Sequence, residues 1–509
     1  MLVVTLTLFA LLRHSQSAKI LGMFFIPAHS HQVMYQPIWR ELSLRGHQVT
    51  VFTPNPLRNS SLTNLTEIDT SLTYDILRRE YIGDKMAKDI YLIDSMLWLE
   101  KVSEEILEEN FKIAKKTFTE LESDFDLVLV ETFHSLVYGL GCRFKVPIIG
   151  VHSLGLFLHT QDAVGNPTHP VLNPDIFFNV MEGFNMYSKI RSVVYNLWYR
   201  LVYYWYVIPK NDRLSKKYWG EDCPYIRDLE KNVSLILVNT NPILHLVRPQ
   251  VPQVVEVGQM HIAPKNVLPR DIQDYLDAST QGVVYFNLGS NVRSASFKIS
   301  ARKIIIEALS ELPYNVLWKW EDDHFPDKPK NVVTRKWLPQ QDILGHRNVK
   351  VFITQGGLQS LEESITNCVP MVGMPVFADQ PLNVYKMVQL GIGRSVDHMT
   401  MTKEELKEAI RDVAENKKYR EKIYKLKDLF SDQPMSGVDK SVWWIEYVLR
   451  HGGAKHLRSA AVDMSWFEYY LLDVFLVLFF VAFVSVYLIS VCVKLSFSTL
   501  RFKHKTKLN

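Results

Sequence analysis

Two adjacent glycines, Gly356 and Gly357, are the first feature of this sequence that could support chemistry. Residues 349–354 alternate and are rich in β-branched side chains, which predicts a buried strand, and residues 358–365 follow at helical spacing. Glycines at the start of a helix let backbone N–H groups approach an anion, and the helix N-terminus adds about half a positive charge. The pair could therefore bind a diphosphate, although an isolated Gly-Gly is more often a simple turn.

Three polar side chains follow these glycines closely in the sequence. Glu363 belongs to the same predicted helix, and its carboxylate could accept hydrogen bonds from two neighbouring ribose hydroxyls. Asp379 and Gln380 come after the next predicted strand, residues 369–374, and could bind sugar hydroxyls. Because the loops after the carboxyl ends of strands line the ligand crevice of an open α/β sheet, we expect the two loops to meet.

An aromatic side chain and an amide precede this region. Trp337 offers a flat stacking surface, and Gln340 offers an amide for the edge of a base. Buried structural tryptophans are common, so Trp337 alone carries little weight. Together with the two loops, these residues predict a pocket for a nucleotide sugar.

Residues 337–393 resemble the signature of the UDP-glycosyltransferases, membrane-bound enzymes that conjugate small lipophilic molecules with the sugar of a UDP-sugar. The resemblance implies a role for each matched residue: Trp337 and Gln340 hold uracil, Glu363 holds ribose, Gly356 and Gly357 hold the diphosphate, and Asp379 and Gln380 hold the sugar. The UDP-sugar is then a co-substrate, and no further cofactor is expected.

One position departs from the vertebrate members of that family, which usually carry histidine before the glycine pair. This chain has Gln355 there. A glutamine amide can donate a neutral hydrogen bond to a phosphate oxygen, but it cannot carry a charge. Glutamine at this position resembles the insect branch, whose usual donor is UDP-glucose.

The resemblance extends upstream to residues 283–291, which are predicted to form the first strand of a second sheet and a Gly-Ser turn. Ser290 would reach the phosphates from this turn. Serine after glycine is equally well explained as an ordinary helix cap.

The first half of the chain predicts another α/β domain. A strand at 20–26, a helix at about 32–44 and a strand at 49–53 form the opening of a doubly wound sheet. The loop after the first strand contains His31, and histidine suits removal of a proton from an alcohol near neutral pH. A histidine near a helix start is more often a cap or a surface residue, but the resemblance identifies His31 as the catalytic base.

A base needs an orienting partner, and Glu131 follows a predicted strand at 126–130. Its carboxylate could hold the imidazole of His31. The vertebrate members carry aspartate at the matching position. The longer glutamate keeps the charge but changes the geometry of the hydrogen bond.

Length and composition fit a large membrane-attached enzyme. The 509 residues exceed one usual core, and 47% hydrophobic with 22% charged residues is typical of globular chains. The net charge of +4 is small, and no basic run interleaved with aromatics precedes the extreme C-terminus, so nucleic acid is not an expected partner. We expect an α/β fold with two doubly wound, Rossmann-like domains facing across a cleft, of the GT-B type, followed by a transmembrane helix.

The expected order of segments is as follows: a signal peptide at 1–17, an N-terminal acceptor-binding domain at 18–257, a linker at 258–280, a UDP-sugar-binding domain at 281–440, terminal helices returning to the first domain at 441–470, a transmembrane helix at 471–493 and a basic tail at 494–509. The positive-inside rule places the tail in the cytosol and the catalytic domains in the lumen. Lysines near the C-terminus resemble an endoplasmic reticulum retrieval signal, which predicts a single-pass type I protein of that membrane.

Residues 176–208 are rich in Phe, Tyr and Trp. Such a segment could line an acceptor pocket or touch the bilayer surface, and helices packed on the sheet are about equally expected. The sequence does not decide between these possibilities.

The predicted function is inverting transfer of a hexose, with glucose from UDP-glucose expected, to a hydroxyl of a small lipophilic acceptor. His31 is the expected base, and the glycine-rich helix terminus with Ser290 would stabilise the leaving UDP, so no metal is expected. One alternative is a membrane-anchored binding protein for lipophilic molecules without turnover. Another is the same enzyme dedicated to a steroid hormone or a lipid. Assembly into homo-oligomers stays open.

Overall fold

The computed structural model describes residues 17–80, 92–121, 124–178, 185–245 and 247–505. The chain divides into two compact units, Met1–Arg458 and Ser459–Asn509. The predicted signal peptide lies outside the described residues except for Ser17, and so do residues 506–509 of the basic tail.

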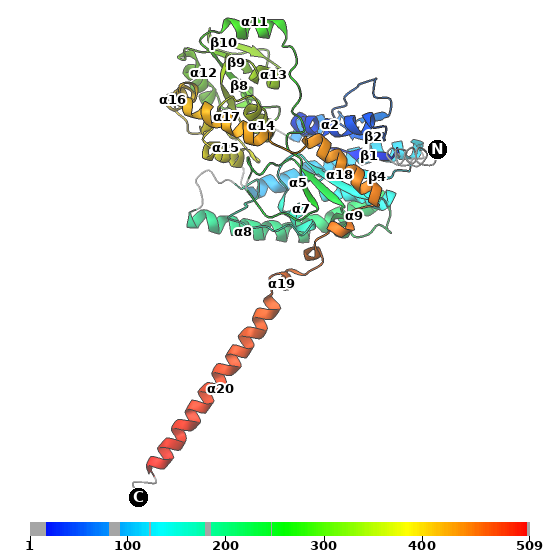
Figure 1. Ribbon diagram of the computed structural model, residues 1–509, viewed down its shortest axis with the longest axis vertical. Coiled ribbons are helices and arrows are strands. Elements are labelled where there is room, and N and C mark those ends of the chain that lie inside the picture. The colour runs from blue at the N-terminus through cyan, green and yellow to red at the C-terminus, as the bar shows by residue number, and fades with distance from the viewer. Residues whose placement is uncertain (1–16, 81–91, 122–123, 179–184, 246, 506–509) are drawn as a thin grey trace, which may run out of the picture. The chain divides into compact units, whose positions relative to one another are not determined.

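The first unit begins with a sheet of seven parallel strands in the order β3-β2-β1-β4-β5-β6-β7 (Figure 1). Its strands are β1 (Lys19–Met23), β2 (Gln48–Thr53), β3 (Leu65–Asp69), β4 (Leu127–Glu131), β5 (Ile148–His152), β6 (Leu235–Val238) and β7 (Val254–Glu256). Because β1, β4 and β5 are neighbours and run parallel, the residues that follow them meet at one edge of the sheet.

A second sheet of six parallel strands has the order β10-β9-β8-β11-β12-β13. Its strands are β8 (Val283–Asn287), β9 (Asn315–Lys319), β10 (Val332–Arg335), β11 (Val349–Thr354), β12 (Met371–Gly373) and β13 (Gly393–Ser395). The central strands are fully buried, as expected for a parallel sheet covered by helices on both faces. The predicted fold class, two Rossmann-like α/β sheets with a C-terminal apolar helix, is confirmed.

Helices cover both sheets. Those of the first domain are α2 (His29–Leu44), α3 (Thr73–Glu80), α5 (Leu92–Leu121), α6 (Leu140–Phe144), α7 (Leu158–Ala163), α8 (Met186–Val202), α9 (Ile208–Trp219) and α10 (Ile226–Lys231). Those that follow are α11 (Arg270–Ala278), α12 (Ile299–Ser310), α13 (Gln340–Leu344), α14 (Leu358–Thr366), α15 (Gln380–Gln389), α16 (Lys403–Glu415), α17 (Lys417–Ser431) and α18 (Gly437–His451). A π-helical turn, Tyr203–Val207, joins α8 to α9, and short 3₁₀ turns lie at Ser135–Gly139, Ser294–Ser296, Lys455–Leu457 and Ala460–Val462.

Two segments connect the domains. The segment predicted as a linker contains α11, whose Tyr275 hydroxyl donates a hydrogen bond to the Val316 carbonyl of the second sheet. Helix α18 returns to the first domain and packs on α2, where Arg45 pairs with Glu446 at 3.4 Å. The apolar side of α18 is buried with the core of the first sheet, so the two domains form one compact unit.

The second unit contains α19 (Trp466–Tyr469) and the long helix α20 (Leu472–Lys505), drawn in red in Figure 1. Residues Leu472–Phe497 are long and apolar enough to cross a membrane, with a mean hydropathy of 2.8. The apolar stretch therefore begins close to the predicted position and runs four residues further than the predicted 471–493. This helix indicates that the protein is anchored in a membrane.

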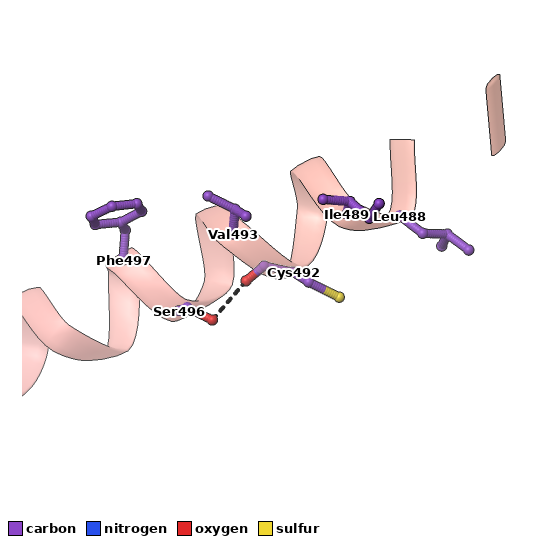
Figure 2. A pocket seen from close by; sticks show the side chains of 6 residues that line it. All are labelled: Leu488, Ile489, Cys492, Val493, Ser496 and Phe497. Atoms are coloured by element: carbon purple, nitrogen blue, oxygen red, sulfur yellow. Dashed lines mark hydrogen bonds between the residues drawn. The ribbon is translucent and has the colours of Figure 1, made fainter. Parts of the chain in front are cut away.

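Figure 2 shows a shallow hollow on the side of α20. It is lined by Leu488, Ile489, Cys492, Val493, Ser496 and Phe497. The Ser496 hydroxyl donates a hydrogen bond of 2.9 Å to the Cys492 carbonyl, so this polar group is satisfied inside the helix. A hollow made by one apolar helix fits lipid chains better than a polar ligand.

Candidate active site

The glycine pair lies between β11 and α14, as the sequence predicts. Gly356 has φ +84°, and a Cβ there would collide with the side chain of Val384, so this position requires glycine. Gly357 is the N-cap of α14, whose first backbone N–H groups have no partner within the helix. The loop therefore offers close backbone approach and unpaired donors, which are the features that bind a phosphate.

Gln355 joins this loop to the loop after β8. Its side chain is buried and lies against Gly289, where any Cβ would overlap the amide. The Oε1 atom of Gln355 has no hydrogen-bond partner among the residues that the structure describes. Ser290 is exposed beside it and donates to Asn291, and the nearby Lys319 ammonium donates to the Gly289 carbonyl at 2.9 Å. Lys319 also pairs with Glu321 at 3.1 Å, so it places a neutralised ion pair beside the loop expected to hold phosphate, a feature that sequence reasoning missed.

Gln340 and Glu363 are brought together. The Gln340 Nε2 atom donates to Glu363 Oε2 at 2.7 Å and to Ser360 Oγ at 2.9 Å. Its Oε1 atom accepts from Asn287 Nδ2 at 2.7 Å. The Gln340 amide is thus fully engaged within the protein, and its direct effect is to fix the Glu363 carboxyl. Sequence reasoning expected instead that this amide would be available to a base.

Burial raises the pKa of Glu363 to about 7, while the hydrogen bonds from Gln340 and Gln341 oppose the rise. The carboxyl group therefore titrates near neutral pH. Hydroxyl donors placed against it would favour the ionised form.

Trp337 is not a buried structural tryptophan, because 57% of its surface is exposed. Its ring meets the His29 ring edge to face, with 4.8 Å between the ring centroids. His29 belongs to the first domain, so the two domains touch at the residue expected to stack on a base. The exposed indole is consistent with a stacking role.

Asp379 and Gln380 begin α15, on the loop after β12. Asp379 Oδ2 accepts from Asn383 Nδ2 at 2.6 Å, and Gln380 Oε1 accepts from the backbone N–H groups of Val376 and Phe377. Burial raises the pKa of Asp379, whereas the hydrogen bond from Asn383 and the nearby His31 imidazole lower it. The predicted sugar loop of the second domain is therefore near the predicted base of the first.

His31 lies in the first turn of α2, which begins at His29, three residues before the expected helix start. Its Nδ1 atom is 2.9 Å from the Ser153 hydroxyl and 3.5 Å from Glu131 Oε1. The nearest partner of the imidazole is therefore Ser153, the residue that follows β5, rather than the expected Glu131.

Glu131 is fully buried and is held by two other donors. Its Oε2 atom accepts from the Ile26 backbone N–H at 2.9 Å, and its Oε1 atom accepts from the Tyr35 hydroxyl at 3.0 Å. Ser153 and Glu131 therefore lie beside the same ring nitrogen of His31, and Tyr35 helps to fix the carboxylate. With the proton on Nδ1, the Nε2 atom of His31 is left as an acceptor.

Ser153 and Tyr35 were missed by sequence reasoning. The signal for Ser153 was its position after a predicted parallel strand, at the same sheet edge as His31 and Glu131. The signal for Tyr35 was its spacing of four residues from His31, which places both side chains on one side of a helix.

Helix α14 contacts the first domain directly. The Gln359 Nε2 atom donates to the Ser153 carbonyl at 3.3 Å, and His261 Nε2 lies 3.3 Å from the Gln359 carbonyl. Burial raises the pKa of Glu362, in the same helix, to about 8. The helix that begins at the glycine pair therefore packs against the loop that holds the base.

This fold and site define a glycosyltransferase that uses a nucleotide sugar and is built from two facing Rossmann-like domains. Residues 19–507 match the family described as "UDP-glucoronosyl and UDP-glucosyl transferase", and the chain belongs to that family. It is a UDP-glycosyltransferase, an enzyme that uses a UDP-sugar donor and an acceptor, and the binding-protein alternative is set aside.

Several relatives match along nearly the whole chain. UDP-glycosyltransferase UGT5 of Dactylopius coccus is 35% identical, over 95% of this chain and 93% of the relative. An ecdysteroid UDP-glucosyltransferase of Spodoptera littoralis nuclear polyhedrosis virus is 33% identical, over 91% of this chain and 94% of the relative. Human UDP-glucuronosyltransferase 2B15 is 31% identical, over 88% of this chain and 87% of the relative. Among solved structures, the glycotransferase of kitacinnamycin matches in fold, with a TM-score of 0.58, 19% identity and coverage of 85% of this chain and 99% of that chain.

Proposed function

We propose that this enzyme transfers glucose from UDP-glucose to a hydroxyl group of a small lipophilic acceptor, with inversion at the anomeric carbon. The observation that carries the proposal is the contact between the two domains at the base: Ser153 Oγ lies 2.9 Å from His31 Nδ1, and the Ser153 carbonyl accepts a hydrogen bond from Gln359 of α14. It supports a reaction centre where the base and the helix that begins at the glycine pair face each other. Gln355 and the UDP-glucosyltransferase relatives support glucose as the sugar.

In the proposed mechanism, Nε2 of His31 takes the proton of the acceptor hydroxyl. The acceptor oxygen forms a bond to the anomeric carbon as the bond from that carbon to the diphosphate breaks, and UDP leaves with the electron pair. Attack from the face opposite UDP inverts the configuration. Glu131, whose Oε1 atom lies 3.5 Å from Nδ1 and accepts from the Tyr35 hydroxyl, would stabilise the imidazolium that forms.

The negative charge that develops on UDP would lie at the start of α14. The backbone N–H groups after Gly356, together with Gln355 and Ser290, are the proposed donors. Trp337 would stack on uracil, and Gln340 would position the uracil end of the pocket. Glu363 would accept hydrogen bonds from the ribose hydroxyls. Asp379 and Gln380 would hold the sugar.

A steroid acceptor is a second candidate, because two viral relatives are named ecdysteroid UDP-glucosyltransferases. For either acceptor, we propose that α20 anchors the enzyme in the endoplasmic reticulum membrane with the catalytic domains in the lumen. We expect these domains to be protected from protease in sealed microsomes. Their digestion would indicate the opposite orientation, with the catalytic domains in the cytosol.

The donor is tested with membranes that contain the full chain. They receive labelled UDP-glucose or labelled UDP-glucuronate with a panel of phenols, flavonoids and ecdysteroids. We expect glucose transfer, with kcat/KM for UDP-glucose at least about tenfold above that for UDP-glucuronate. A preference for glucuronate would refute the proposed sugar, and transfer confined to ecdysteroids would establish the second candidate.

The pKa of Glu363 predicts that UDP binding depends on pH. In the free enzyme this group is protonated below about pH 7, whereas ribose hydroxyls that donate to it favour the carboxylate and lower its pKa. Binding therefore releases a proton, and the UDP affinity should rise with pH until about 7, by up to about tenfold per unit well below that value.

Calorimetry of UDP binding between pH 5 and 9, chosen to span about two units on each side of that pKa, measures this effect. The control is Glu363→Gln, which cannot titrate, so any pH dependence it retains belongs to the phosphates of UDP. An identical pH profile for both proteins would contradict the assignment of ribose to Glu363.

A further inference from the structure

Helix α8 and the π-helical turn after it present an apolar face to the outside. This apolar face consists of Tyr187, Ile190, Val194, Leu197, Leu201 and Trp205. Each side chain is between 50% and 79% exposed. Their spacing of three and four residues places them in one stripe along the helix.

The opposite side of the same helix is polar and buried. The hydroxyl groups of Tyr195, Tyr199 and Tyr203 hydrogen-bond to Asp175, His159 and Glu230. A helix at the surface of a water-soluble domain normally has the reverse arrangement, with its apolar stripe facing the core. The exposed stripe is larger than scattered surface residues would give, so it is expected to contact something other than water.

The charged residues of the segment that carries the apolar face are all basic. Between residues 186 and 207 the chain contains Lys189, Arg191 and Arg200 and no acidic residue. Arg200 pairs with Asp162, whereas Lys189 and Arg191 are exposed, and the Arg191 guanidinium lies over the Tyr187 ring. An apolar stripe with aromatic residues and a basic border matches the boundary between anionic lipid headgroups and acyl chains.

The chain leaves the first unit close to this helix. Arg458, its last residue, donates to the carbonyl of Lys231 at the end of α10. On the same short helix, the Arg227 guanidinium lies 4.9 Å from the centre of the Tyr204 ring, which continues α8. Only the segment 459–471 separates Arg458 from α20, so a bilayer that holds α20 lies within reach of the apolar face.

We propose that the apolar face of α8 lies in the surface of the bilayer and forms a second membrane contact of this enzyme. Tyr187, Leu197 and Trp205 enter the region between headgroups and acyl chains, and Lys189 and Arg191 meet anionic headgroups. The proposal rests on membrane anchoring by α20 and is independent of the sugar and the acceptor.

The same contact brings the reaction centre close to lipid. Ring contacts continue from His31 through Phe133 and Phe157 to His159, and His159 bonds to Tyr199 on the inner side of α8. Four ring side chains in series, Phe133, Phe157, His159 and Tyr199, thus connect the base to the inner side of α8. A lipophilic acceptor dissolved in the bilayer would then approach the site from the α8 side.

The test uses the full chain in liposomes of phosphatidylcholine with a minority of phosphatidylserine. A cysteine at position 197, made by Leu197→Cys, carries an environment-sensitive fluorophore in a protein whose exposed Cys492 and partly exposed Cys142 are replaced by serine. The matched control is Leu429→Cys on α17, because Leu429 is 61% exposed and Leu197 is 60% exposed. Sugar transfer by both labelled proteins verifies that they are folded.

We expect blue-shifted emission at position 197 that lipids brominated near the headgroup quench, and water-like emission without quenching at position 429. Water-like, unquenched emission at both positions would overturn the proposal. A blue shift at position 197 that brominated lipids do not quench, and that grows with protein concentration, would also overturn it, because a second copy of the chain would then cover the face.

Discussion

Replacement of His31 by glutamine is expected to lower kcat about 1,000-fold while the affinity for UDP stays unchanged. A positioned general base contributes roughly 100- to 10,000-fold to a rate, and glutamine keeps a polar side chain at this site without a basic nitrogen. His31 is held through Nδ1 by Ser153, so its Nε2 atom is the only ring nitrogen left for the acceptor. Among the described residues, none of those expected to hold UDP makes a hydrogen bond to this ring.

Initial rates with saturating UDP-glucose and acceptor, together with calorimetry of UDP, measure the two quantities. The matched control is His29→Gln, which changes the same residue type in the same turn of α2. His29 contacts Trp337, so its loss should raise the KM for UDP-glucose and leave kcat within about threefold. An equal fall in kcat for both variants would remove His31 from its role as the base.

The elements that carry the donor site could be predicted from the sequence because their signals are local. Alternation of β-branched residues located β11 at its observed bounds, and the glycine pair located the start of α14. Helix α2 was harder to place, because Ala28 at its N-cap makes no side-chain hydrogen bond and so leaves no capping signal.

The contacts that orient His31 could not be predicted in the same way, since they join distant parts of the chain. Ser153 meets His31 across 122 residues, and Tyr35 meets Glu131 across 96 residues. Composition also left the aromatic segment undecided, because apolar and tyrosine side chains alternate there. Only the structure shows that Tyr195, Tyr199 and Tyr203 face inward, whereas the apolar face of α8 faces outward.

Replacement of Asp379 by asparagine is expected to reduce kcat/KM for UDP-glucose about 100-fold. A hydrogen bond to a charged group contributes roughly 1.5–3 kcal/mol, and the variant loses the charge that sugar hydroxyls would meet. Asp379 also interacts with His31, so its negative charge would stabilise the imidazolium formed when the acceptor loses its proton. Both kcat and kcat/KM should therefore fall, in contrast to a residue that only binds the ground state.

The inhibition constant of UDP, which lacks the sugar, should stay within about twofold of the unmodified enzyme. Asparagine keeps an oxygen that can accept from Asn383, whose amide also donates to the Gly356 carbonyl of the phosphate loop. Asp397→Asn is the matched control: this exposed carboxylate follows β13, accepts from the Met399 backbone N–H and the Thr400 hydroxyl, and lies 4.0 Å from the His398 ring. If UDP binding weakens in parallel with kcat/KM in the Asp379 variant, the loop has collapsed and Asp379 does not hold the sugar. If kcat and kcat/KM fall while UDP binding stays unchanged, the carboxylate acts between the sugar and the base. Asp379 then joins the donor half of the site to the acceptor half.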